Sequence, residues 1–205
     1  KVSDKDVEKQ IQAKLKNAGE KKLTEAFIKK NTDNECKTKA EYEKHVREQL
    51  EKDKKNSVGS ELLSKVSGDS KLKKTPKLQL KAAKKDVEQN YEQMASQYGM
   101  DVDSLIKAYG MDEKSYQAMV KNGAKESVKL HLVAHAIAKE EGIRLSSSDY
   151  DQRLKEFKES TGLSEKQFKK QAGSSYEDYA KENNFEEYFF QEKVGQFLVD
   201  KATAK

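Results

Sequence analysis

The longest apolar run in this sequence lies in Glu126–Leu145, within a chain that is otherwise strongly polar. A helix at a protein surface shows one apolar stripe with a period near 3.6 residues. This run has more than one, because Val128 and Leu132 lie on one side of a helix while Leu130 and Val133 lie on another. The pattern predicts a helix that other helices cover on several sides. At about 17 residues, with internal Lys and two His, the run is too short and too polar to predict a membrane span.

Elsewhere, apolar residues recur at helical spacing, and long strand-like alternation is absent. We therefore expect an all-α chain of helices covering roughly the residue ranges 1–17, 23–30, 38–66, 77–98, 113–141, 149–160, 176–182 and 185–203, with short helices around Leu105 and Phe168. Capping boxes are expected at four starts, namely Ser3 with Asp6, Thr38 with Glu41, Ser148 with Asp151 and Ser164 with Gln167. Gly59 is expected to mark a bend in a long helix.

A short repeat interrupts this pattern. Tyr98-Gly99-Met100-Asp101 recurs eleven residues later as Tyr109-Gly110-Met111-Asp112. In each copy the Gly suits a left-handed helix end, and the Asp suits the first position of the next helix. The repeat predicts a tight helical corner with exposed Met and Tyr side chains.

Composition points to a thin core. The chain is 34% hydrophobic and 38% charged, with one Pro among 205 residues. Long helices with little core fit these values better than a compact α/β enzyme does. The net charge is only +5, with acids and bases interspersed, which favours a solvated mixed surface over nucleic-acid binding. The basic stretches Lys71–Lys77 and Lys81–Lys85 contain no aromatic residue on which a base could stack.

The residues needed for catalysis or for a cofactor are not evident. His131 and His135 have the i, i+4 spacing of two metal ligands, but no third ligand is indicated. We expect two partly buried, hydrogen-bonded histidines and no metal. Cys36 is the single cysteine, which excludes an internal disulfide. Nucleophile-elbow and phosphate-loop motifs are missing, so we expect no catalytic residue, no cofactor and no nucleotide.

Methionine and tyrosine are concentrated in one segment. All four Met lie within Met94–Met119, interleaved with Tyr91, Tyr98, Tyr109 and Tyr116. Met is flexible and polarisable, so it suits adaptable binding surfaces. A second concentration of aromatic residues runs from Tyr176 to Phe190. Ordinary packing between helices remains an alternative reading for each of these residues.

From Leu23 onward the sequence resembles the C-terminal substrate-binding domain of trigger factor, the bacterial folding chaperone. The segments that carry the resemblance are, in order, LTEAFIKKN, EYEKHVREQLEKDKK, QYGMDVDSLIKAYGMDEKSYQAMV and AKESVKLHLVAHAIAKEEGIRLSSSDYDQRLKEF. The resemblance implies an elongated helical body with two protruding arms, between which unfolded segments bind. By position, Tyr98–Met111 is one arm tip, and Leu163–Phe168 with the turn before Tyr176 belongs to the other.

The resemblance also implies a single domain, 1–205. Residues 1–15 resemble the linker helix that packs on this domain, and residues 16–22 stand where an isomerase domain would be inserted. That insertion is either naturally absent or removed, and ribosome-docking residues are absent as well. Because the chain begins at Lys1 and not Met, we expect a fragment or a processed form.

The function implied is an ATP-independent chaperone module for unfolded or nascent polypeptides. The expected peptide-binding residues are Met94, Tyr98, Met100, Leu105, Ile106, Tyr109, Met111, Tyr116, Met119, Leu163, Phe168, Tyr176 and Tyr179. Two alternatives stay open: the substrate-presenting part of a prolyl isomerase, and an assembly module for one fixed partner. Self-association through the arms stays open too. The resemblance implies a cytoplasmic protein, with an exported or surface-anchored foldase as the alternative.

Overall fold

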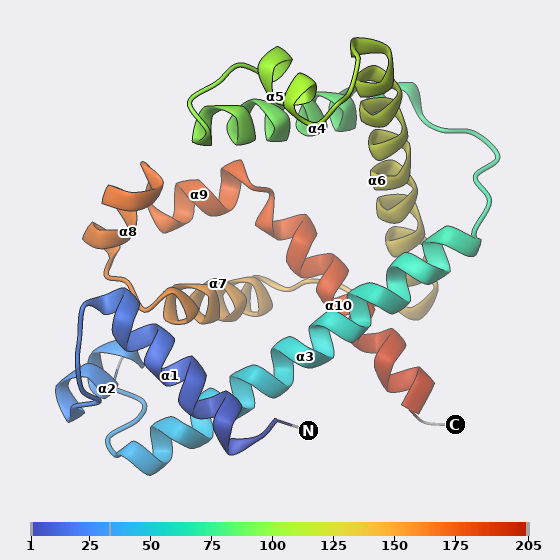
Figure 1. Cartoon of the computed structure of the whole chain (residues 1–205). Coiled ribbons are helices and arrows are strands. Elements are labelled where there is room, and N and C mark those ends of the chain that lie inside the picture. Colours follow the sequence, from blue (N-terminus) through green and yellow to red (C-terminus); the bar gives the residue numbers. More distant parts are fainter. Residues whose placement is uncertain (1, 33, 204–205) are drawn as a thin grey trace. The chain divides into compact units, whose positions relative to one another are not determined.

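The computed structural model describes residues 2–32 and 34–203, and these residues form ten α-helices without a β-strand (Figure 1). The all-α prediction is confirmed. Lys1, the expected start of the first helix, lies outside the described residues. The helices are α1 Asp4–Ala18, α2 Glu25–Asn31, α3 Lys39–Asp69, α4 Lys77–Gln97, α5 Val102–Ala108, α6 Glu113–Glu141, α7 Ser147–Thr161, α8 Glu165–Ala172, α9 Tyr176–Glu182 and α10 Phe185–Thr203.

Side-chain caps set most of the helix starts. The predicted capping boxes at Ser3, Thr38 and Ser164 are confirmed. The prediction for α7 is wrong: Ser146, not Ser148, is the N-cap, and Asp149, not Asp151, completes the box. Because the Tyr150 amide already donates to the Ser146 carbonyl at 3.0 Å, the helix has begun two residues before the predicted cap.

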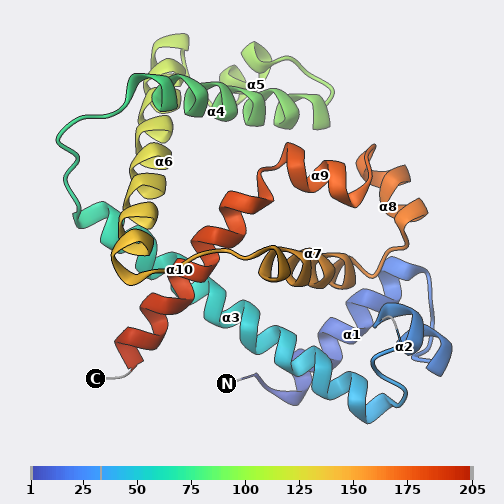
Figure 2. The same ribbon diagram turned by 180° about the vertical axis from the view of Figure 1, so that it is seen from behind.

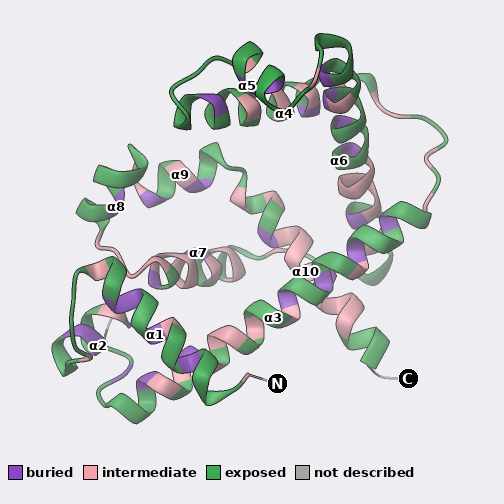
Figure 3. Ribbon diagram, viewed as in Figure 1, coloured by how far each residue is buried: buried purple, intermediate pink, exposed green. Residues whose placement is uncertain are grey.

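The chain divides into two compact units. Unit 1 combines the residue ranges 1–62 and 142–205, and unit 2 is the continuous segment Leu63–Glu141. Each unit has its own buried apolar clusters, and the burial colours in Figure 3 show these as short bands along the helices. The thin core expected from composition is thus divided among several small clusters. The single domain 1–205 stays a prediction.

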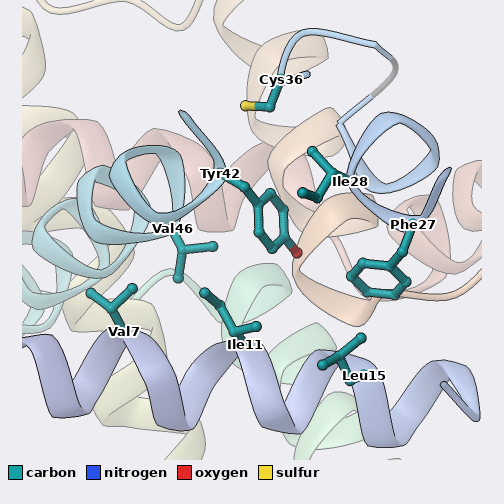
Figure 4. Packing of buried hydrophobic residues seen from close by; sticks show 8 residues of the cluster. All are labelled: Val7, Ile11, Leu15, Phe27, Ile28, Cys36, Tyr42 and Val46. Carbon is teal, nitrogen blue, oxygen red and sulfur yellow. The ribbon is translucent and has the colours of Figure 1, made fainter. Parts of the chain in front are cut away.

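In unit 1, the first helix docks through a narrow stripe. Val7, Ile11 and Leu15 point from α1 toward Tyr42 and Val46 of α3, with Phe27 and Ile28 of α2 closing the cluster (Figure 4). The buried Tyr42 hydroxyl donates to Asn31 Oδ1 at 2.8 Å, so its one polar group is satisfied. A stripe this narrow cannot hold an isolated helix of this length, so the docking explains why α1 forms.

A partly buried network of hydrogen bonds ties α1 to α3 and α7. Lys14 Nζ donates to Gln49 Oε1 at 3.0 Å, and Gln49 Nε2 donates to Glu159 Oε2 at 2.9 Å. His45 Nε2 lies 3.1 Å from the same carboxylate oxygen. Burial lowers the pKa of Lys14, because the charged form loses its water. These hydrogen bonds satisfy polar side chains that would otherwise be costly to bury.

Two glycines lie at the crossing of α3 and α10. A Cβ atom built on Gly59 would lie 2.6 Å from the carbonyl carbon of Gly195, and one on Gly195 would lie 2.8 Å from that of Gly59. Gly59 therefore permits close contact between backbones, and α3 continues through it without a break. The predicted bend stays a prediction. Beside the crossing, the Arg153 guanidinium of α7 donates twice to the Glu192 carboxylate of α10, each time at 2.9 Å.

In unit 2, α4 packs on α6, and α5 lies beside α4 (Figure 2). Ala83 meets Ala124 and Val128 at one end of the α4–α6 contact, and small residues allow the helices to approach. The apolar run in Glu126–Leu145 is only partly covered. Its Ala134 and Ala138 are buried, whereas Leu130, Leu132, Val133 and Ile137 are half-buried. Among the described residues, no helix is both long and apolar enough to cross a bilayer.

Candidate functional site

The repeated Gly-Met-Asp turn builds the corner of unit 2. Gly99 and Gly110 adopt left-handed φ angles of +67° and +70°, which favour glycine. Asp101 then accepts the Ser104 amide at 2.7 Å, and Asp112 accepts the Ser115 amide at 2.7 Å. These bonds lower the pKa of both carboxyl groups, because they stabilise the ionised form. The predicted turn is confirmed in both copies, but of the Met and Tyr side chains predicted to be exposed in the repeat, Met111 is half-buried.

Four predicted residues are exposed at this corner. Tyr98 and Tyr109 are 64% and 57% exposed, and Met94 and Met100 are each 37% exposed. The Tyr109 hydroxyl lies 3.8 Å from the Met94 sulfur, so the two side chains adjoin. We call Met94, Tyr98, Met100 and Tyr109 the corner surface.

The other predicted residues of unit 2 lie beneath the corner surface. Leu105, Ile106 and Tyr116 are buried, and Met111 and Met119 are half-buried. Ile106, Tyr116, Met111 and Met119 belong to one cluster, in which Tyr91 and Tyr116 meet edge to face at 5.4 Å between centroids. Such residues hold the α4, α5 and α6 backbones in place and so support the exposed side chains.

The four predicted residues of unit 1 surround the start of α8. Leu163, Phe168 and Tyr179 line a pocket of about 530 Å³ together with Asn17, Thr161, Gln171 and Ala172, and we call this the α8 pocket. Tyr176 is buried behind it, with its ring stacked on Phe168 at 3.7 Å between centroids. The Tyr176 hydroxyl donates to the Leu163 carbonyl at 3.2 Å, which fixes the pocket wall.

A larger cleft in unit 1 was not predicted from the sequence. It measures about 650 Å³, and its aromatic side chains are Phe157, Phe185, Tyr188 and Phe189. Carboxylates of α3 and α7, including Asp53 and Glu156, line the same cleft. The aromatic concentration near the C-terminus was visible in the sequence, but nothing there indicates that α3 forms the opposite wall.

The two histidines of α6 lie close together, with ring centroids 4.3 Å apart. His131 is half-buried as expected, but His135 is exposed, so the prediction of two partly buried histidines is wrong for His135. A step of four residues turns about 40° around a helix, which is enough to bring the second ring into solvent.

The surfaces described so far offer apolar contact and little sequence-specific polar chemistry. Residues 37–200 match the family model described as bacterial trigger factor protein C-terminus, which is most of the chain. The chain belongs to the trigger factor C-terminal family. The match includes both copies of the corner repeat and all of α4 to α9, whereas α1 and α2 lie before its first residue.

Individual trigger factors match at moderate identity. The trigger factor of Staphylococcus saprophyticus is 27% identical over 152 residues, which cover 72% of this chain and 35% of the relative. That of Bacillus subtilis is 27% identical over 150 residues, with 71% and 35% covered. That of Halothermothrix orenii is 35% identical over 68 residues, with 33% and 16% covered. No solved structure matches the chain.

The chain therefore spans about a third of the length of the curated trigger factors that it matches. Its match is to their C-terminal part, and their prolyl isomerase domain is not matched. The place of residues 1–22 in such a protein stays a prediction, because the family match begins later.

Proposed function

We propose that this chain is an ATP-independent chaperone module that holds unfolded or nascent polypeptide segments. The corner surface carries this proposal. A soluble protein gains no stability from leaving two methionines and two tyrosines of one corner exposed to water, so their exposure favours a binding role. Membership of the trigger factor C-terminal family supports the same function.

The proposed mechanism is reversible apolar capture. Met side chains adapt to different partners because they are unbranched and polarisable, and Tyr adds a large ring with a polar end. Each contact is weak, so a client is held by several contacts at once and leaves when it can bury its own residues. The clustered residues beneath the corner, such as Ile106 and Tyr116, keep the exposed side chains in position without contacting the client.

In unit 1, the α8 pocket is the second proposed contact. Its walls carry Leu163, Phe168 and Tyr179, and its volume of about 530 Å³ accommodates one or two apolar side chains. Each surface is proposed to bind an apolar segment on its own.

The test is suppression of aggregation for several unrelated unfolded proteins. A variant with Met94→Ser, Tyr98→Ser, Met100→Ser and Tyr109→Ser should bind such clients at least tenfold more weakly. A tenfold loss of affinity corresponds to about 1.4 kcal/mol of binding free energy. The control variant, Leu78→Ser with Tyr188→Ser, removes exposed apolar surface elsewhere and should retain activity. An equal loss of aggregation suppression in both variants would show that the corner surface has no special role in client binding.

Two other functions give different results. An assembly module for one fixed partner would bind a single folded protein and leave unfolded clients to aggregate. A prolyl isomerase would turn over a proline-containing peptide, whereas we expect no turnover from this chain. For a trigger factor relative we propose the cytoplasm as the compartment, with an exported foldase as the alternative.

A further inference from the structure

Residues 71–85, which span the linker before α4 and the first turns of α4, are strongly basic. Between residues 71 and 85 there is no Asp or Glu, and the nearest acids along the chain are Asp69 and Asp86. We call this segment the basic segment; its seven lysines are Lys71, Lys73, Lys74, Lys77, Lys81, Lys84 and Lys85. No other stretch without an acid contains more than three lysines, so this local excess is a distinct feature.

Helix geometry places the charge on the outer side of α4. Leu80, Ala83 and Val87 of α4 pack toward α6. With about 100° between successive residues, the exposed Lys77, Lys81 and Lys85 fall within a sector of roughly 80° away from this face, whereas Lys84 lies beside Leu80 and is half-buried. Leu78 lies at the edge of this sector, opposite the packed face, and is 84% exposed. A large apolar side chain thus stands in water among lysines.

The charge is not arranged for the stability of the helix. The first turn of α4 contains no acid, and its N-cap, Pro76, makes no side-chain cap hydrogen bond. Each of the other nine described helices has an acid in its first turn. Because a helix N-terminus is already partly positive, lysine there is unfavourable.

The surroundings in unit 2 add charge of both signs. Lys129 of α6 donates to the Gly68 carbonyl at 2.9 Å, which brings another cation close to the start of the segment. Glu88 and Glu92 lie further along the outer side of α4, beyond the last lysine of the segment. The positive surface is therefore limited to the linker before α4 and its first two to three turns.

We infer that the basic segment and Leu78 form a docking surface for a membrane that contains anionic phospholipids. Lysines near such a surface contribute roughly 1 kcal/mol each, and a leucine between them can enter the region below the headgroups. The outer side of a single helix is convex, which suits a layer of mobile headgroups better than an extended acidic peptide. No aromatic residue lies within the segment, which disfavours single-stranded nucleic acid.

Docking of this kind would place the module at a membrane surface without a spanning helix. The interaction would be peripheral and reversible, since it depends on charge that salt screens within roughly 10 Å at 0.1 M. This inference does not depend on client binding, because it uses a different part of α4 from the corner surface.

The experiment is co-sedimentation of the full chain with vesicles. Vesicles of phosphatidylcholine with phosphatidylglycerol should bind the protein at low salt, and binding should fall steeply as NaCl is raised. Vesicles of phosphatidylcholine alone should bind at least tenfold less. Equal binding to both kinds of vesicle, or absence of binding to the anionic vesicles, would overturn the inference. So would tighter binding to a single-stranded oligonucleotide than to the anionic vesicles.

Matched variants locate the surface. The change Lys77→Gln, Lys81→Gln and Lys85→Gln should weaken binding by roughly 100-fold, from about 1 kcal/mol for each lysine. The same change of net charge in α8, with Lys166→Gln, Lys169→Gln and Lys170→Gln, should weaken it far less. Equal loss in the two triple variants would mean that only net charge matters and would contradict a defined surface.

Two single variants separate docking from folding. Leu78→Gln should weaken vesicle binding without changing the dependence on salt. Lys77→Glu should abolish most of the binding while raising the thermal midpoint, because it places an acid at the N-terminus of α4. Full vesicle binding by Lys77→Glu would count against the inference, and the thermal midpoint shows in the same sample that the fold is intact.

Discussion

At the residue scale, Gly59 and Gly195 decide how closely α3 and α10 approach. Neither glycine has a left-handed backbone, so each is needed for space and not for its φ angle. The two helix backbones are in contact here, and there is no room for a side chain, since a Cβ on either glycine would lie within 3 Å of the backbone of the opposite helix. The hydrogen bonds of Asn56 in α3 with Glu192 and Gln196 in α10, at 3.1 and 2.6 Å, join the same two helices.

Gly59→Ala should destabilise the protein. The added methyl group forces the two helices apart, and overpacking of this kind costs about 1–3 kcal/mol in the free energy of unfolding. Gly68→Ala, in the same helix, should be neutral or stabilising by up to about 1 kcal/mol, because nothing lies within 4 Å of its Cβ position and Ala favours the helix. Urea denaturation compares the stabilities of the two variants. Equal stability would contradict a close backbone contact between α3 and α10 at Gly59.

At the element scale, the sequence predicts the helices well but the contacts between them poorly. Caps and left-handed glycines are local signals, so the starts at Ser3 and Ser164 and the ends before Gly99 and Gly142 were predictable. Three consecutive serines made the start of α7 ambiguous. Two of them could cap, and the choice depends on the Asp149–Lys193 ion pair, 2.6 Å long, with a helix that is distant in sequence.

The candidate site shows the same division between local and distant information. Met94, Tyr98, Met100 and Tyr109 were predictable because the repeated turn is a local motif. In the seven-residue helix α5, however, periodicity cannot show which side faces the core, and Leu105 and Ile106 are both buried. The cleft of about 650 Å³ was not predictable, because its walls come from α3 and from the last third of the chain.

The corrected cap of α7 gives a prediction. Ser146→Ala should lower the free energy of unfolding by about 1 kcal/mol, the usual cost of losing an N-cap. Ser148→Ala should change the free energy of unfolding by a few tenths of a kcal/mol at most, because the Ser148 hydroxyl lies inside the first turn. Thermal or urea unfolding at neutral pH measures both. A larger effect of Ser148→Ala than of Ser146→Ala would show that Ser148 is the N-cap, as predicted from the sequence.

The same cap makes α7 sensitive to acid. The pKa of Asp149 is lowered below its ordinary value of 3.8, chiefly by the hydrogen bond from Lys193 and those from Ser146. A lowered folded-state pKa contributes stability above the ordinary value, and this is lost as the pH falls through the folded-state pKa. The stability difference between the wild type and Asp149→Asn should therefore be constant near neutral pH and shrink below pH 3.8.

At the scale of the whole molecule, unit 1 is made of two distant parts of the chain. Helices α1 and α2 with most of α3 come before unit 2, and α7 to α10 come after it. Contacts such as Lys14–Gln49–Glu159 and Gly59–Gly195 join the two parts. The integrity of unit 1 therefore does not depend on the connection between α3 and α4.

Brief treatment with trypsin tests this arrangement. The exposed, non-helical Lys71, Lys73 and Lys74 should be cut early, since proteases prefer such loops. After cleavage, the two fragments should remain together on gel filtration under native conditions and separate only in denaturant. Fragments that part without denaturant would contradict a unit 1 built from both parts of the chain.

The divided unit 1 has a consequence for biosynthesis. Once α1, α2 and the part of α3 that belongs to unit 1 have been made, the ribosome must add all of Leu63–Glu141 before the first residue of α7 exists. At about 5–20 residues per second, this delay lasts roughly 4–16 s. During it, Gln49 and the glycine face of α3 lack their partners Glu159 and Gly195, and unit 2 is itself still being made. A nascent copy of this protein therefore passes through a period in which it is itself an unfinished chain in need of protection.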